Sequence, residues 1–491
     1  MAKQPIFRDL KQGNKLHQRG NIPAAAAAYR RYVNGNPQDK TGHYNLAVTL
    51  EAAHQLEPAI LSYCRAIEID PWYPEALNNL GILLHSQGNL AAARQCYARA
   101  LASRPGYDDA EYNLATAESD AANYQEAVFH FSRILERSPR RANTWNNLGN
   151  ALLALRAPAD ALNAFQLALS LQPGYHDAQW NSSVAQLTLG QLPAGWTGFE
   201  LRGKLRHASL PRWSPASPPG RQVLIHAEQG LGDTIQFLRY CSQVLPAHIT
   251  LECHPALIPL FGSFPDMAAS VAFGSDVSFA DCQIPLMSLP LALGTSLSTI
   301  PTAVPYLFAD PALIQTWRTQ LAVPPGHLAV GLVWAGNPGH RNDRNRSLSP
   351  ALLGVLGNPA NVSFYCLQQK PQSEAFTGLR FAGIYDELKF PDTAAIVSNL
   401  DLVVSVDTAV AHLAGALGKP VWTLLPFAPD WRWMLDRPDT PWYPTMRLFR
   451  QPRLNDWQSV LENVKSELER LRDDLHKRTQ LASFRNLPLT H

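Results

Sequence analysis

The chain has 491 residues, of which 46% are hydrophobic and 17% charged, and its formal net charge at pH 7 is +2. A chain of this length and composition is expected to form two or three globular domains with sizeable cores. The near-neutral charge argues against nucleic acid or an anionic membrane as a partner.

Cysteine use and the character of the N-terminal residues predict a cytoplasmic protein. The six cysteines form no C-x-x-C pair, so we interpret them as reduced, mostly buried thiols. The first residues, MAKQPIFRDLKQGNK, lack the apolar core of a signal peptide, and no apolar run reaches membrane-spanning length. We therefore expect a soluble protein without a transmembrane segment.

A period of 34 residues runs through the first part of the chain. Each repeat carries a small residue, an alanine, an aromatic residue and a proline at fixed spacing. In five successive repeats these are Gly13, Ala47, Gly81, Ala115 and Gly149; Ala25, Ala59, Ala93, Ala127 and Ala161; Tyr29, Tyr63, Tyr97, Phe131 and Phe165; and Pro37, Pro71, Pro105, Pro139 and Pro173. Small residues let two helices approach closely, the aromatic residue fills the space between repeats, and proline ends the second helix. The pattern resembles the tetratricopeptide repeat family and predicts a helical superhelix over residues 1–208, followed by a linker at 209–220.

Asparagine recurs with the same period, at Asn45, Asn79, Asn113, Asn147 and Asn181. On the first helix of each repeat these residues would form a ladder along the inner face of the superhelix. A side-chain amide carries both donor and acceptor, so each rung can pair with a peptide backbone without reading its sequence. The alternative is a packing role, because asparagine is common at this place in tetratricopeptide repeats. The array is a binding module, and it carries no chemistry of its own.

From residue 221 the pattern changes to alternating strands and helices, which predicts an α/β fold. A first lobe, residues 221–324, opens with a buried strand at 222–226, followed by Gly230, Gly232, Asp233 and a helix. The motif G-L-G-D is not the full dinucleotide fingerprint. Its glycines do allow a tight turn, which would bring backbone amides and Asp233 up to a ligand at a helix start.

A second lobe, residues 325–455, is followed by an amphipathic helix and tail at 456–491. Three of its predicted strands, at 328–335, 362–367 and 400–406, end in polar residues, and parallel strands deliver such residues to one edge of a sheet. The residues so placed are Asn337, Arg344 and Arg346 after the first strand, Gln368 and Lys370 after the second, and Asp407, Thr408, Ala409 and His412 after the third. Guanidinium groups bind phosphate oxygens in bidentate fashion, so this edge predicts a phosphate-bearing ligand. The alternatives are a solvated charge run and a capped helix with a core histidine.

Two motifs carry a resemblance to a known family. G-L-G-D-T-I-Q-F at 230–237 is similar to the G-D turn of the ADP-heptose–lipopolysaccharide heptosyltransferases, and D-T-A-V-A-H-L-A-G-A at 407–416 is similar to their D-T-G-x-x-H-x-x-A-A signature. Residues 221–450 thus resemble a GT-B glycosyltransferase with two Rossmann-like lobes. The resemblance implies that Asp233 is the base that deprotonates the acceptor hydroxyl, and that residues 407–409 and His412 contact the nucleotide sugar. This chain departs from the family in having Ala409 where glycine is usual, and an arginine-rich loop where a Thr/Lys motif is typical.

The combination of repeats, asparagine ladder and GT-B half also resembles the O-GlcNAc transferase family. In that family the superhelix feeds a protein acceptor to the active site, and a Gln/Lys pair holds the nucleotide diphosphate. Gln368 and Lys370 stand in the matching place, with a spacing that is not identical. The motif W-x-x-F-E-x-R at 196–202 is similar to one found before the core of bacterial tetratricopeptide glycosyltransferases.

The prediction is a glycosyltransferase that moves a sugar from a nucleotide-diphosphate donor to a hydroxyl of a polypeptide held by the repeats, for example a surface or flagellar protein before export. No D-x-D motif stands at these strand ends and cations can replace a metal, so neither metal nor cofactor is expected; an inverting outcome is implied by the resemblance. His226 and Glu228 are alternative bases. Alternative functions are modification of a glycan or lipid carrier, with the repeats docking a partner, and a non-catalytic scaffold. The W-R-W at 431–433 fits either a sugar or base pocket or the core, and the oligomeric state stays open.

Overall fold

The computed structural model describes residues 4–203, 206–244, 246–262, 264, 267–340, 342–368, 379–381 and 389–485. The chain falls into two compact units, Met1–Asn181 and Ser182–His491, and each is described by itself. Of the helices in the described ranges, none is both long and apolar enough to cross a membrane. Because the division falls at 181/182, the last helix of the predicted array belongs to the second unit.

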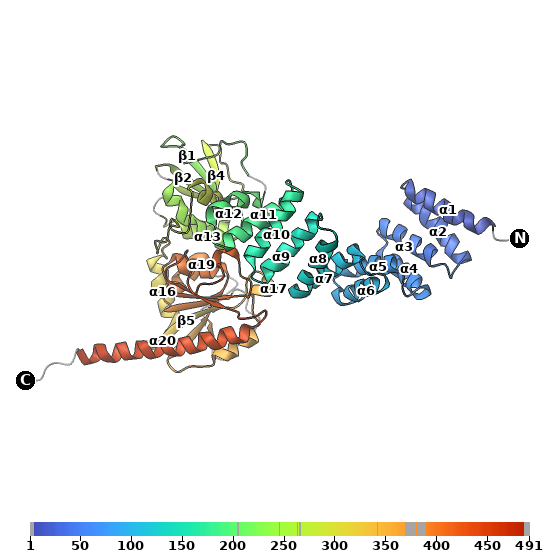
Figure 1. Ribbon diagram of the computed structural model, residues 1–491. Coiled ribbons are helices and arrows are strands. Elements are labelled where there is room, and N and C mark those ends of the chain that lie inside the picture. The colour runs from blue at the N-terminus through green and yellow to red at the C-terminus, as the bar shows by residue number, and fades with distance from the viewer. Residues whose placement is uncertain are drawn as a thin grey trace, which may run out of the picture. The chain divides into compact units, whose positions relative to one another are not determined.

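The first unit is a stack of helical pairs, the predicted tetratricopeptide superhelix (Figure 1). The pairs are α1 (Gln4–Gln18) with α2 (Ile22–Gly35), α3 (Lys40–Ala52) with α4 (Leu56–Ile69), α5 (Pro74–Ser86) with α6 (Leu90–Ser103), α7 (Asp108–Asp120) with α8 (Tyr124–Arg137), and α9 (Ala142–Ala154) with α10 (Pro158–Leu171). Each repeat proline lies just beyond the end of a second helix, as Pro37 does after α2, where its missing N–H and fixed φ stop the helix. The helix α11 (His176–Thr188) spans the division between the units.

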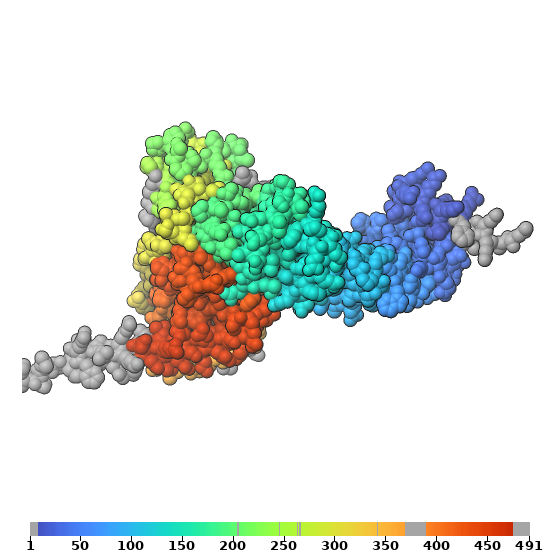
Figure 2. All heavy atoms as spheres, viewed as in Figure 1, coloured from blue at the N-terminus to red at the C-terminus, as the bar shows by residue number. Residues whose placement is uncertain are grey.

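The small and aromatic registers of the repeats pack on each other. A Cβ atom added to Gly81 would lie 2.5 Å from a ring carbon of Tyr97, far inside normal carbon–carbon contact, so the close approach of α5 and α6 requires glycine here. Tyr97 also forms a buried cluster with Leu114 and Ala117 of the following repeat. The predicted role of the aromatic residue between repeats is therefore confirmed. With all heavy atoms drawn, side chains fill the space between successive pairs of this unit (Figure 2).

The second unit opens with a four-stranded parallel sheet, in the order β3-β2-β1-β4. Its strands are β1 (Gln222–His226), β2 (His248–Cys253), β3 (Ala269–Ala272) and β4 (Cys282–Pro285). The helix predicted after Asp233 is α13 (Leu231–Phe237), which begins earlier than expected and continues as a 3₁₀ segment, Leu238–Gln243. The reason for the early start is the side chain of Asp233, which caps the first turn by accepting a hydrogen bond from the Gly230 amide.

The second lobe holds a six-stranded parallel sheet, in the order β10-β9-β8-β5-β6-β7. Its strands are β5 (Leu328–Val333), β6 (Val362–Cys366), β7 (Leu379–Phe381), β8 (Leu402–Val406), β9 (Val421–Leu425) and β10 (Met446–Arg450). In both sheets the first strand of the lobe lies between the second and the fourth, which is the doubly wound Rossmann order. The predicted α/β part with two Rossmann-like lobes, the GT-B arrangement, is therefore present.

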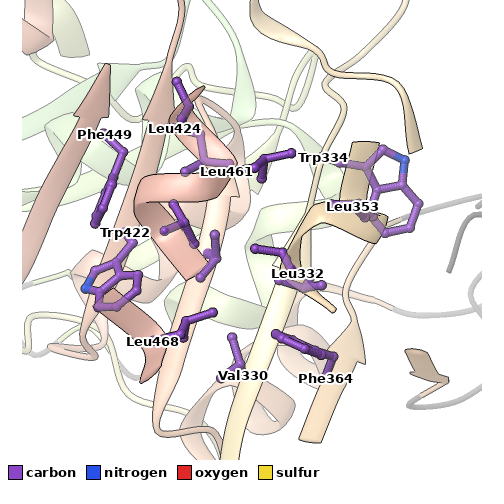
Figure 3. Close-up of a cluster of buried hydrophobic side chains, with 14 of the residues drawn as sticks. Val330, Leu332, Trp334, Leu353, Phe364, Trp422, Leu424, Phe449, Leu461 and Leu468 are labelled. Carbon is purple, nitrogen blue, oxygen red and sulfur yellow. The ribbon is translucent and has the colours of Figure 1, made fainter. Parts of the chain in front are cut away.

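Helices complete the second unit. They are α12 (Leu192–Phe199), α14 (Ile258–Phe261), α15 (Leu289–Ala292), α16 (Pro311–Leu321), α17 (Asp343–Arg346), α18 (Phe390–Ser398), α19 (Ala409–Ala416) and α20 (Trp457–Arg485). Apolar side chains of α20, among them Leu461 and Leu468, lie against Leu332, Trp422 and Phe449 of the second sheet (Figure 3). This burial on one face of the sheet explains why the amphipathic helix packs against the second lobe.

Candidate functional site

The candidate site lies at the carboxyl ends of β5 and β8. These two strands are parallel neighbours, and the strand order of the sheet reverses between them, which is where doubly wound sheets bind ligands. The tip of the second predicted strand, β6, is tied to the same place. The side-chain oxygen of Gln368 accepts hydrogen bonds from the amides of Trp334 (3.2 Å) and Ala335 (3.0 Å) directly after β5. The Gln368 oxygen therefore supports the β5 tip, while the predicted contact of this residue with a diphosphate stays a prediction.

The arginine-rich loop and the β8 turn are joined by Arg346. Its Nη1 donates to the carbonyl oxygen of Asp407 at 3.2 Å, and its Nε lies 3.3 Å from Oδ1 of Asp343. A Cβ atom on Gly336 would lie 2.5 Å from Nη2 of Arg346, so only glycine leaves room for the guanidinium at this strand tip. The structure thus brings the tips of β5, β6 and β8 together, as the sequence predicted.

The remaining residues predicted at this edge differ in their setting. Arg344 and Asn337 are exposed on the loop, and the Asn337 side chain accepts a hydrogen bond from the Gly339 amide at 2.9 Å. Lys370 lies outside the described residues. Thr408 is the N-cap residue of α19, and its hydroxyl lies 3.0 Å from that of Ser405 rather than capping the helix; Ala409 is the first helical residue.

The half-buried Asp407 and the buried His412 pair at the start of α19. Nε2 of His412 lies 3.7 Å from Oδ1 of Asp407, and its Nδ1 lies 3.0 Å from the hydroxyl of Tyr443. The imidazole, 4% exposed, also stacks on the ring of Trp433. Burial alone would raise the pKa of the Asp407 carboxyl, but His412 and the charge of Arg432 lower it, so Asp407 is held ionised.

The space around α19 explains why the 407–416 motif contains a small residue at Gly415. A Cβ atom on Gly415 would lie 2.5 Å from a ring carbon of Tyr443, so glycine lets that ring lie against α19 and reach His412. The glycine of this Ala/Gly-rich helix therefore helps to position His412, because it makes room for the tyrosine that contacts the imidazole.

The turn of the first lobe lies directly against this helix. A Cβ atom on Gly232 would lie 2.9 Å from Cδ2 of His412 and 3.4 Å from Cα of Ala409, so the two motifs are in contact. The helices α13 and α19 lie side by side (Figure 1). Two motifs far apart in the sequence, one from each lobe, thus meet in one place.

Arg432 crosses between the lobes at the same point. Its Nη2 forms an ion pair with Oδ1 of Asp233, its Nη1 donates to Asp430 at 2.8 Å, and its Nε donates to Oε1 of Gln236 at 2.9 Å. Burial would lower the pKa of this guanidinium, but Asp430 and Asp233 raise it. The sequence flagged Arg432 only as part of the W-R-W, and no signal in the spacing connects it with Asp233.

The two alternative bases have structural partners. His226 is fully buried, with its Nε2 2.9 Å from Oε1 of Gln283. Glu228 forms an ion pair with Arg202 and accepts a hydrogen bond from the Met287 amide at 3.4 Å. Burial raises the pKa of the Glu228 carboxyl despite the opposing effect of Arg202.

Burial of His226 predicts a pH-dependent stability. Burial lowers its pKa from 6.5 to about 4, so between these values the unfolded chain binds a proton that the folded chain does not. The free energy of unfolding is therefore full above pH 6.5 and falls as the pH drops toward 4. The loss from this group is about 2–3 kcal/mol.

His226→Gln is expected to reduce that loss in denaturant titrations at neutral and acidic pH. His248→Gln, at an exposed position in the same lobe, is the control and should keep it. An unchanged pH dependence in His226→Gln would show that other groups cause it.

The asparagine ladder is engaged in hydrogen bonds between repeats. The amide nitrogen of each of the four rungs after Asn45 donates to a residue on the first helix of the preceding repeat, at the position just before the preceding rung. The bonds run from Asn79 to the Tyr44 hydroxyl (3.3 Å), from Asn113 to Asn78 (2.9 Å), from Asn147 to the Tyr112 hydroxyl (2.9 Å) and from Asn181 to Asn146 (2.9 Å). The ladder therefore does support packing, the alternative noted above, and its rungs, Asn45 included, stay half-buried.

The W-x-x-F-E-x-R motif joins α12 to the α/β part. The rings of Trp196 and Phe199, both buried, meet the Trp431 ring edge-on at centroid distances of 5.4 and 5.5 Å. Arg202 at the end of the motif is the partner of Glu228. The motif and the W-R-W thus form one aromatic contact, so Trp431 is a core residue.

Within the described ranges, no group of three or more His, Cys, Asp or Glu side chains is arranged to hold a metal ion.

Different family models match the helical part and the α/β part of the chain. Residues 54–88, 74–107 and 112–176 match models of the tetratricopeptide repeat, and residues 358–434 match the model of glycosyltransferase family 9 (heptosyltransferase). The chain combines tetratricopeptide repeats with a glycosyltransferase family 9 domain. The matched segment of this glycosyltransferase runs through β8, α19 and the W-R-W, whereas the first lobe with Asp233 lies outside it.

Individual curated proteins and solved structures resemble this chain over different lengths. The chain is 26% identical over 419 residues to Protein FlbA of Caulobacter vibrioides, which covers 70% of each chain. It is 33% identical over 73 residues to the tetratricopeptide repeat-containing protein trd-1 of Caenorhabditis elegans, covering 15% of this chain and 10% of that one. Similar solved structures include MamA (21% identity, 34% of this chain and 92% of that one, TM-score 0.33) and Pseudomonas aeruginosa pilF (18%, 40% and 90%, TM-score 0.36).

Proposed function

We propose that this protein transfers a sugar from a nucleotide-diphosphate donor to a hydroxyl of a polypeptide bound by the repeats. The observation that carries the proposal is the contact between the two motifs. The helix start that follows β8 in the second lobe touches the G-L-G-D turn of the first lobe, so a donor held by one meets the candidate base of the other.

The donor is assigned to the second lobe. Its diphosphate would lie near the loop of Arg344 and Arg346 and the start of α19, where guanidinium groups and helix amides favour negative charge. Lys370 and Asn337 belong to the same edge in the sequence, with Asp407, Thr408, Ala409 and His412 at the sugar side. The positive charges of Arg344, Arg346 and Lys370 would offset the charge of the leaving diphosphate. We therefore propose a metal-independent reaction without a cofactor.

Asp233 is assigned the role of general base. In a direct displacement it would accept the proton of the acceptor hydroxyl while the anomeric carbon inverts. Its position supports this assignment, because Gly232 beside it contacts His412 of the donor-side helix. His226 fits the role less well because its side chain is fully buried, whereas Glu228, which like Asp233 pairs with an arginine, stays the alternative base.

A second candidate function concerns the acceptor. The amide nitrogens of Asn79, Asn113, Asn147 and Asn181 are already used between repeats, which leaves them less capacity for a peptide backbone. This observation favours an array that docks a partner protein, with a glycan or lipid carrier as the acceptor. Both functions use the same donor site.

A panel of ADP-, UDP-, GDP- and dTDP-sugars tests the donor site. Thermal shift should identify a nucleotide that stabilises the protein, and intact mass of candidate acceptor proteins should show addition of one sugar. Arg346→Gln is expected to weaken binding of that nucleotide roughly 10- to 100-fold in calorimetry, because a charged hydrogen bond is lost.

Arg453→Gln is the matched control, since this arginine is largely exposed on the second lobe and pairs only locally with Asp456. Equal nucleotide affinity in Arg346→Gln and in the unaltered protein would contradict the phosphate assignment. Absence of any stabilising nucleotide would contradict the proposed function itself.

A further inference from the structure

We propose that Arg432 is a positioning residue that couples the proton acceptor, Asp233, to the departing diphosphate. The inference rests on the proposed function and concerns the same site. Arg432 comes from the second lobe, which is assigned the donor, yet its guanidinium pairs with the candidate base of the first lobe. A cation shared in this way can interact both with the charge of Asp233 on the first lobe and with the charge of a diphosphate on the second lobe.

The geometry holds the guanidinium in one place. Arg432 is 7% exposed and uses three of its nitrogens on Asp233, Asp430 and Gln236. Its planar group also lies over the ring of Trp431, 4.5 Å from the centroid. A guanidinium with a fixed orientation fixes in turn the carboxylate that it binds, because charge-assisted hydrogen bonds are directional.

The surroundings of Arg432 are rich in negative charge. Besides Asp430 and Asp233, Asp407 on the donor-side turn also acts on its guanidinium electrostatically. Since Asp407 in turn pairs with His412, the base, the arginine and the donor-side turn form one connected group of charges. A change of charge on Asp233 is therefore felt at the donor-side turn.

The reaction moves one negative charge across this group. The proton of the acceptor hydroxyl goes to Asp233, and the acceptor oxygen forms a bond to the anomeric carbon. The bond from that carbon to the diphosphate oxygen breaks, and its electron pair stays on the diphosphate. Once Asp233 is neutral, the charge of Arg432 is no longer balanced by it and acts on the diphosphate at the moment that group gains charge.

The test compares Arg432→Lys and Arg432→Ala with the unaltered protein, using the sugar from the ADP, UDP, GDP and dTDP panel that is turned over. Arg432→Ala is expected to lower kcat about 100-fold or more, as loss of one preorganised donor does, with little change in affinity for the nucleoside diphosphate. Arg432→Lys, which keeps the charge, should lose less. Added guanidinium chloride at millimolar concentration should restore part of the kcat of Arg432→Ala.

Arg437→Gln is the matched control, because Arg437 follows in the same loop and forms its ion pair with Asp439 near the surface. Thermal unfolding of each variant reports on folding, and Arg432→Lys keeps the test valid if Arg432→Ala does not fold. A folded Arg432→Ala protein with unchanged kcat would overturn the proposal. So would a folded Arg432→Ala protein whose kcat is not restored by guanidinium, if Arg432→Lys is equally slow. If the unaltered protein turns over no sugar in the panel, the proposed function fails instead.

Discussion

Replacing Asp233 by asparagine is expected to lower sugar transfer by about 10²- to 10⁴-fold, the usual contribution of a general base. The amide side chain cannot accept the proton of the acceptor hydroxyl. Binding of the nucleotide should survive, because the residues assigned to it lie on the second lobe. Steady-state transfer with the donor found in the panel, together with calorimetry of the nucleoside diphosphate, measures the two effects separately.

The structure adds a second expected effect of this substitution. Asp233 caps α13 through the Gly230 amide at 2.8 Å and neutralises the buried Arg432, so its loss also lowers stability. Asp276→Asn, at a surface carboxylate of the same lobe bonded to Ser278, is the control for both measurements. Transfer that continues at the normal rate in a folded Asp233→Asn protein would place the base elsewhere.

Replacing Asn113, Asn147 and Asn181 together by alanine is expected to abolish transfer to a polypeptide and to spare hydrolysis of the nucleotide sugar. The rungs would no longer offer amide groups to a bound chain, whereas the donor site is unchanged. Each substitution also removes a hydrogen bond between repeats, which costs about 0.5–1.5 kcal/mol of stability. Mass spectrometry of the acceptor and release of free sugar report the two activities.

Asn150→Ala provides the comparison for the ladder, because this asparagine is exposed on α9 and lies outside the ladder register. If the triple variant stays folded and still modifies its polypeptide, the ladder serves the stack of repeats alone. That result would favour the docking role of the array and a glycan or lipid carrier as acceptor.

Local patterns in the sequence were sufficient to predict most of the elements around the site. The predicted strand at 400–406 corresponds to β8 (Leu402–Val406), because an apolar run is a signal that acts within a few residues. The same holds for the repeat helices, whose small and aromatic positions meet in contacts such as that of Gly81 with Tyr97. The meeting of three strand tips also followed, since parallel strands share an edge.

Pairings over long distances were beyond the sequence. Arg432 and Asp233 are 199 residues apart, and a charge by itself does not specify its partner. The side-chain oxygen of Gln368 accepts hydrogen bonds from two backbone amides, a contact that depends on how β5 and β6 pack. The predicted contact of Gln368 with a diphosphate would use its amide nitrogen and stays a prediction. The role of Lys370 stays a prediction, because it lies outside the described residues.

The acceptors of the ladder hydrogen bonds alternate between tyrosine and asparagine. The structural repeat of these bonds is therefore longer than one 34-residue repeat. A rung donates in turn to Tyr44, to Asn78, to Tyr112 and to Asn146, so the pattern returns only after two repeats. The array is in this respect two copies of a two-repeat block. An internal insertion or deletion that keeps this alternation of acceptors therefore involves an even number of repeats.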